Sequence, residues 1–146
     1  MCTNMDNIAT TKKRKSLKNK NNIGWKIVKV STAGEYEAPF SNIFNYTYST
    51  RKNRTVDDTV QNCLGNIFGG VFHLFSSRAC GRDMLRVLKS KNHRMSIYNL
   101  KLVKVLYNNK DFYCVGDASN FSEVLMEAIK NHKNNSICVT AFTFAK

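Results

Sequence analysis

The most informative pattern of apolar and polar positions lies in residues 69–88. Residues 71–75 form a mostly apolar run, which is too short for a buried helix and predicts a central β-strand. Ser76 and Ser77 follow this run directly, and their hydroxyl groups are suited to cap the free amides at the start of a helix. The pattern therefore predicts a strand, a serine cap and a helix over residues 78–88.

The expected helix has two different sides. Its apolar side comprises Ala79, Met84, Leu85, Val87 and Leu88. Its other side carries positive charges at four- and three-residue steps, on Arg78, Arg82, Arg86 and Lys89. We expect the first side to pack against a sheet and the second to present a row of cations.

The rest of the chain shows mainly the period-two alternation of β-strands. Strands are expected at residues 25–30, 42–50, 97–107, 111–115 and 137–144, and helices at residues 55–64 and from Asn120 onward. Asn108 and Asn109 are expected to join two of these strands in a hairpin. Most gaps between strands are too short for a crossover helix, which favours antiparallel pairing. The expected fold class is α+β, with a mostly antiparallel sheet of about five to six strands and two to three helices.

A change in composition near residue 23 divides the chain. Residues 1–22 are expected to form a flexible basic arm, because they contain too little apolar surface to become ordered. Residues 23–146 are expected to form a single α+β domain. No apolar run is long enough to span a membrane, and no secretion signal is recognised. These features predict an intracellular, cytoplasmic protein without membrane contact, or a nuclear one in a eukaryotic host.

The chain is strongly basic. It contains 23 Lys and Arg residues against 10 Asp and Glu residues, a formal net charge of +13 at pH 7. Such an excess indicates a polyanionic partner, with a nucleic acid or nucleotide as the first expectation. In the arm, the charge is concentrated in Lys12, Lys13, Arg14 and Lys15, which are expected to contact phosphates.

Within the domain, phosphate contacts are expected at two places. The first is Arg51 and Arg54, which follow a predicted strand. The second is the start of the predicted helix, where the amides and the helix dipole also favour an anion, and comprises Ser76, Ser77, Arg78 and Arg82. Aromatic and basic residues interleave at residues 46–51 and at Trp25–Lys26, a combination that suits both base stacking and core packing.

Two residues are candidates for catalysis. His73 is either a general base that faces a cleft or a packed strand residue with a satisfied hydrogen bond. Cys2 is either an N-terminal nucleophile, if Met1 is removed, or an inert terminal residue. The five cysteines form no C-x-x-C pair and lie at no short spacing from the histidines, so no metal or cofactor is expected.

Several short segments are similar to a group of short, uncharacterised proteins of phages and large DNA viruses. These segments are the Met1–Cys2 start and residues 9–13, 25–30, 38–40, 72–75 and 102–105. The resemblance implies an accessory protein of viral or phage origin, and it implies no particular activity.

Three functions are consistent with these features. The first is a small intracellular accessory protein that binds a nucleic acid or nucleotide through a basic surface. The second is a transferase or hydrolase acting on a nucleotide or nucleic acid, with His73 or Cys2 as its central residue. The third is an antagonist of a host factor, in which the basic surface contacts an acidic host protein. The sequence predicts no oligomeric state.

Overall fold

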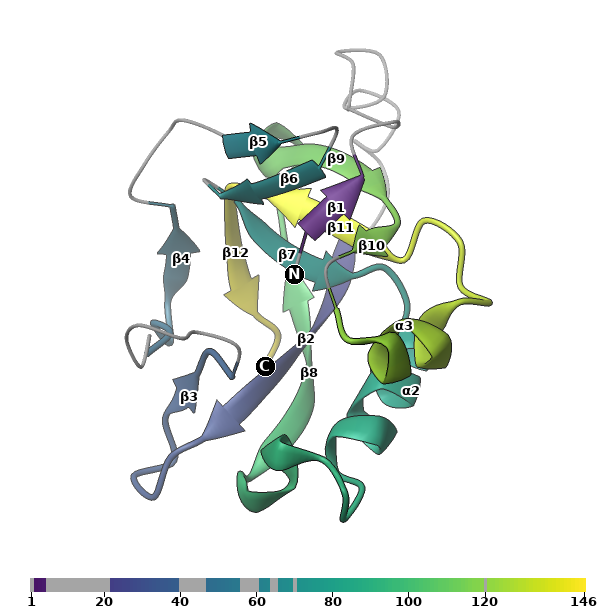
Figure 1. Ribbon diagram of the computed structural model, residues 1–146. Helices are drawn as coiled ribbons and strands as arrows, with labels where there is room; N and C mark the ends of the chain where they lie inside the picture. Colours follow the sequence, from purple (N-terminus) through teal and green to yellow (C-terminus); the bar gives the residue numbers. More distant parts are fainter. Residues whose placement is uncertain are drawn as a thin grey trace.

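The computed structural model describes residues 2–4, 22–39, 47–55, 61–63, 66–69, 71–119 and 121–146 (Figure 1). In chain order, its elements are β1 (Cys2–Asn4), β2 (Ile23–Val30), β3 (Tyr36–Glu37), β4 (Lys52–Arg54), β5 (Gln61–Cys63), β6 (Asn66–Gly69), β7 (Phe72–Phe75), α2 (Arg78–Leu88), the 3₁₀ turn η2 (Arg94–Ile97), β8 (Leu100–Leu106), the 3₁₀ turn η3 (Asn109–Asp111), β9 (Phe112–Gly116), β10 (Ala118–Ser119), α3 (Glu123–Ile129), β11 (Ser136–Val139) and β12 (Ala141–Phe144).

These strands form two sheets. The larger sheet has eight strands in the order β4-β12-β8-β2-β7-β11-β9, with β3 paired to β2, and the smaller has four in the order β10-β1-β6-β5. Every strand pairing among the described residues is antiparallel. The predicted α+β class, the antiparallel sheet and two helices are confirmed. The predicted number of strands is wrong, because the larger sheet alone has eight.

The predicted unit over residues 71–88 is present with nearly the expected bounds, as β7 and α2. Ser77 caps α2, since its Oγ accepts a hydrogen bond from the backbone N–H of Cys80 at 3.1 Å. The buried side of α2 differs from the expected one. It consists of Cys80, Gly81, Met84 and Leu88, whereas Ala79 is exposed.

The two faces of the larger sheet support separate cores. On one face, Ile27, Phe75 and Leu100 pack with the buried residues of α2 and α3. On the other face, an aromatic and aliphatic core surrounds Phe142, which makes edge contacts with the rings of Phe72 and Tyr48. The two helices lie together on one side of the sheet in Figure 1.

The smaller sheet lies across β9 and β11, and its strand β1 contacts both of them (Figure 1). The sheet joins distant parts of the chain, because Cys2 in β1 pairs with Ser119 in β10 and Thr3 pairs with Ile67 in β6. Residues 2–4 of the expected arm therefore belong to a sheet.

Four local predictions are wrong. The predicted helix 55–64 contains strand β5, and residues 48–50 of the predicted strand 42–50 are irregular, while 42–46 lie outside the described residues. Asn108 and Asn109 do not form a hairpin, because β9 pairs with β11 and not with β8. The predicted strand 137–144 is divided at Thr140 into β11 and β12, which pair with different neighbours.

Gly24 allows β2 to approach β7 closely. A Cβ atom at this position would lie 2.7 Å from Cδ1 and 3.0 Å from Cβ of the fully buried Leu74. We expect Gly24→Ala to lower the free energy of unfolding by about 1–3 kcal/mol, because the Leu74 Cβ cannot move without its strand. Urea unfolding at neutral pH measures this difference.

Gly81→Ala is the matched control for this substitution. Its Cβ would meet mainly the end of the half-buried Leu102 side chain, with Cδ1 at 2.6 Å, and such an end can rotate away. Alanine is also preferred over glycine inside a helix by about 1 kcal/mol. A loss of stability at Gly81 equal to that at Gly24 would contradict the explanation.

Candidate functional site

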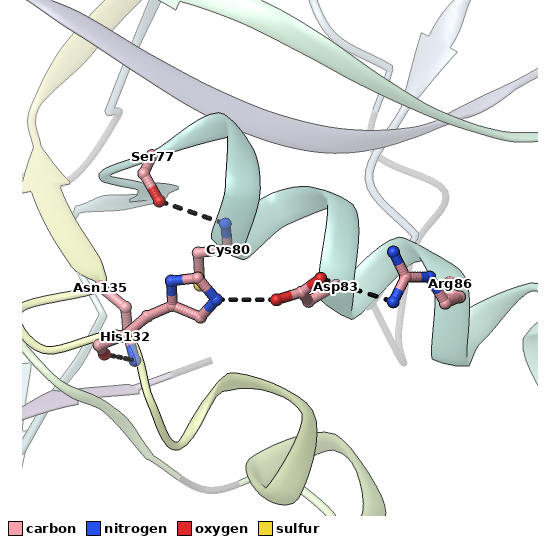
Figure 2. Close-up of polar contacts among 6 residues, drawn as sticks. All are labelled: Ser77, Cys80, Asp83, Arg86, His132 and Asn135. Atoms are coloured by element: carbon pink, nitrogen blue, oxygen red, sulfur yellow. Dashed lines mark hydrogen bonds and ion pairs between the residues drawn. The ribbon is translucent and has the colours of Figure 1, made fainter.

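The exposed side of α2 carries the predicted row of cations. Arg78, Arg82, Arg86 and Lys89 are all exposed. Asp83 is the one acidic residue of this helix, and it contacts Arg86 at 3.7 Å and His132 Nε2 at 2.8 Å. Figure 2 shows Asp83 between these two partners, so that it ties α2 to the loop after α3. Most of the positive charge of α2 is therefore directed to solvent.

The start of α2 has fewer free hydrogen-bond donors for an anion than the sequence predicts. The Cys80 amide is already bonded to Ser77 (Figure 2), and the amide of Gly81 donates to the Ser77 carbonyl at 3.2 Å. Ser76 is held by a hydrogen bond from its own amide to the Asn135 carbonyl at 2.9 Å. These two serines stabilise the helix start, and the cations beyond them are the accessible groups.

Trp25 lies beside this row of cations. The guanidinium of Arg78 is 5.6 Å from the centre of the indole ring. Lys104 is the cross-strand partner of Trp25 and shares its face of the sheet. A half-buried indole with two neighbouring cations is a surface that suits a nucleobase and its phosphate.

Lys26 does not belong to this surface, although it follows Trp25 in the sequence. Its side chain points to the opposite face of the sheet, where its Nζ donates to the His73 carbonyl at 3.0 Å. The same Nζ lies 5.4 Å from the centre of the Tyr48 ring and 5.8 Å from that of Phe142. Burial lowers the pKa of Lys26 to about 8, since the charged amine loses its hydration there.

A second cluster of charges lies at the β4 edge of the larger sheet. Asp111 is buried, with a side chain 5% exposed, and its carboxylate lies 3.7 Å from Lys52 Nζ and 3.9 Å from Arg54. Its other close neighbour is the Thr140 hydroxyl, 3.4 Å from Oδ1. Arg54 was predicted to contact phosphate, and here it flanks a carboxylate.

Asp111 also lines a cavity of about 340 Å³. The walls are formed by Lys52, Leu106, Tyr107, Asn108, Asp111, Ala141, Phe142 and Thr143. Tyr107 stacks on Phe112 with 6.3 Å between ring centres, and burial raises its pKa. Leu106 is 40% exposed, so an apolar side chain remains in contact with solvent at the cavity. The cavity thus combines apolar walls with one buried carboxylate and one cation, that of Lys52.

His73 lies in a third environment, on the face of β7 opposite to Phe72 and Leu74. Its Nδ1 is 3.5 Å from the thiol of Cys138, and Cys138 in turn pairs across the sheet with Cys114. Burial, with a contribution from the charge of Lys26, lowers the pKa of His73 to about 3. A histidine with this pKa is neutral near pH 7 and is a weak general base, which favours the packed-residue interpretation.

The remaining predicted site residues fall into separate groups. Arg51 and Arg54 lie at β4, on the opposite side of the molecule from Arg78 and Arg82 in α2 (Figure 1). Cys2 lies in β1. The predicted phosphate contacts Lys12, Lys13, Arg14 and Lys15 lie outside the described residues. Those predicted residues that the structure describes are therefore not brought together at a single site.

Three residues of these clusters were not predicted, namely Lys52, Lys104 and Asp111. Lys52 and Arg54 occupy alternate positions, which in a strand places both side chains on one face. That spacing was the signal in the sequence that could have placed Lys52 beside Arg54. It was missed because residues 51–54 were expected to follow a strand and not to form one.

Comparisons with protein-family models, curated proteins and solved structures found no match to this chain. Its resemblance to short viral proteins therefore stays a prediction. Within the described residues, no group of three His, Cys, Asp or Glu side chains is arranged to hold a metal ion. Among the helices of the described segments, none has both the length and the apolar character needed to cross a bilayer.

The lowered pKa of His73 predicts a dependence of stability on pH. Below its ordinary pKa of 6.5, the unfolded chain takes up a proton that the folded protein does not accept until about pH 3. The free energy of unfolding therefore decreases as the pH falls through this range. We expect His73→Gln to change stability by about 1 kcal/mol or less at pH 7.5, and to gain about 1–2 kcal/mol relative to the original protein at pH 5.

Urea unfolding of both proteins at the two pH values measures this gain. A stability difference that is the same at pH 7.5 and pH 5 would show that the imidazole titrates alike in the folded and unfolded states. The comparison at pH 7.5 serves as the control for packing changes caused by the substitution itself.

Proposed function

We propose that this protein binds single-stranded nucleic acid through the face that carries α2 and Trp25. The observation that supports this most is the position of Trp25, with Arg78 over its ring and Lys104 opposite it on β8. Proteins that bind single strands combine a positively charged track with aromatic rings on which unpaired bases stack. Trp25 supplies such a ring, and α2 supplies the charge.

The spacing of the cations on α2 suits a phosphate backbone. Arg78, Arg82 and Arg86 recur every four residues, so successive side chains are about 6 Å apart along the helix axis. Phosphate contacts of this kind provide affinity and position without selecting a sequence. The net charge of +13 would increase the association rate through long-range attraction. The α2 face is therefore proposed as a binder of low sequence selectivity.

The two alternative functions receive less support. Catalysis by His73 is disfavoured by its lowered pKa. Antagonism of a host protein calls for an exposed apolar patch or a free strand edge, and the exposed side chains speak only against the first of these. Among the described residues, the large apolar side chains that are most exposed are Ile97, Tyr98, Leu106 and Val124, which are divided among three parts of the chain.

Salt dependence tests the proposal. We expect a fluorescein-labelled single strand to bind with an affinity whose logarithm falls linearly with the logarithm of the salt concentration, by about 0.7 per phosphate contacted. The double variant Arg78→Gln, Arg82→Gln should reduce that slope by about 1.4, because two contacts are lost. Fluorescence anisotropy measured from low to moderate salt gives the slope.

Lys130→Gln with Lys133→Gln is the matched control, since it removes two exposed charges at and after the end of α3. This control should keep the original slope. Trp25 is the single tryptophan of the chain, so its fluorescence should also be quenched when a strand binds. If both double variants reduced the salt slope equally, binding would depend only on the overall charge of the protein. That result would overturn the proposed role of the α2 face.

A further inference from the structure

We propose that the cavity at Asp111 is a second binding site, separate from the α2 face, and that it takes a nucleobase. The assignment of a nucleobase as the ligand rests on the proposed function. The base belongs either to a free mononucleotide or to an unpaired position in a strand, and these two sources share the same recognition chemistry.

The buried carboxylate of Asp111 is the feature that indicates a ligand. Asp111 Oδ2 is shielded from solvent and has no hydrogen-bond donor among the described residues. Its ion-pair partner Lys52 lies 3.7 Å away, which exceeds hydrogen-bond distance. A ligand that brought an N–H group to this acceptor would stabilise it, once a neighbouring side chain such as the partly exposed Lys52 had moved to give access.

The neighbouring groups define what that ligand must carry. Asp111 Oδ2 accepts a hydrogen bond and Lys52 Nζ, beside it, donates one. The edge of a nucleobase presents a donor next to an acceptor and so complements this pair. Tyr107 supplies an aromatic wall for a flat ring. A bare phosphate does not fit the same position, because the Asp111 carboxylate repels it.

Size and exposure indicate how the ligand is oriented. The cavity of about 340 Å³ lies near the lower limit of small-molecule sites, which range over roughly 300–1,000 Å³. Exposure of the charged side chains rises from 5% at Asp111 to 36% at Lys52 and 56% at Arg54. The base therefore lies inward at Asp111, and a 5′-phosphate extends outward to Arg54, where the cation can still turn toward solvent.

Binding of adenosine 5′-monophosphate and cytidine 5′-monophosphate to the full chain tests the site, with ribose 5-phosphate as the ligand without a base. We expect saturable binding of both nucleotides by calorimetry, and binding of ribose 5-phosphate at least tenfold weaker. Asp111→Asn should weaken nucleotide binding at least tenfold. No saturable nucleotide binding, or equal binding of ribose 5-phosphate, would overturn the proposal.

A second variant keeps the test independent of the stability of Asp111→Asn. Asn108 lines the cavity, is exposed and makes no side-chain cap bond to η3, so Asn108→Trp should block the cavity without altering the fold. Lys110→Gln is the matched control, because Lys110 lies in the same turn, is exposed and is absent from the cavity wall. Unchanged nucleotide affinity in Asn108→Trp would also overturn the proposal.

The same variants separate the two sources of the base. If Asp111→Asn weakens both mononucleotides and a ten-residue single strand, the site takes a base of the strand. If it weakens only mononucleotides, the site takes a free nucleotide. Arg78→Gln with Arg82→Gln should weaken the strand and spare the mononucleotides, so that failure of the α2 face and failure of the cavity give different results.

Discussion

The ladder between β2 and β8 is the interaction on which the rest of the structure depends. Seven consecutive residue pairs, from Ile23 with Leu106 to Lys29 with Leu100, align the two strands. This register directs Trp25 toward the helices and Lys26 toward the opposite core. A shift of one residue would exchange the two faces, and would place a charge under α2 and an indole inside the aromatic core.

The positive charge of the chain is distributed over three different environments. Arg82 on α2 and Lys89 at its C-cap are exposed, and their charge is available to an anion in solution. Lys26 lies among aromatic rings, and Lys52 is ion-paired with the buried Asp111. Composition therefore indicates the sign of a partner's charge, but strand register and burial decide which cations of this protein can reach that partner.

The parts of the fold that were predictable are those with local signals. The β7–α2 unit was assigned because an apolar run, a serine cap and a helical period follow one another directly. Strand β5 was expected to be helical, and it is stabilised by pairing with β6, whose own strand pattern was not recognised. Asp111 meets Lys52 only because two separated segments assemble, and the surface at Trp25 likewise depends on pairing with Lys104. Neither arrangement has a signal within one stretch of sequence.

The long separation between the paired strands has a consequence for synthesis on the ribosome. β2 is complete at Val30, but its main partner β8 ends at Leu106. At roughly 5–20 residues per second, the ribosome needs about 4–15 s to supply that partner. During this interval β2 lacks its main partner, and the charges of Lys26 and Lys29 oppose its pairing with another unfinished chain. The same Lys26 whose charge is disfavoured inside the finished core is thus expected to oppose aggregation of the nascent chain.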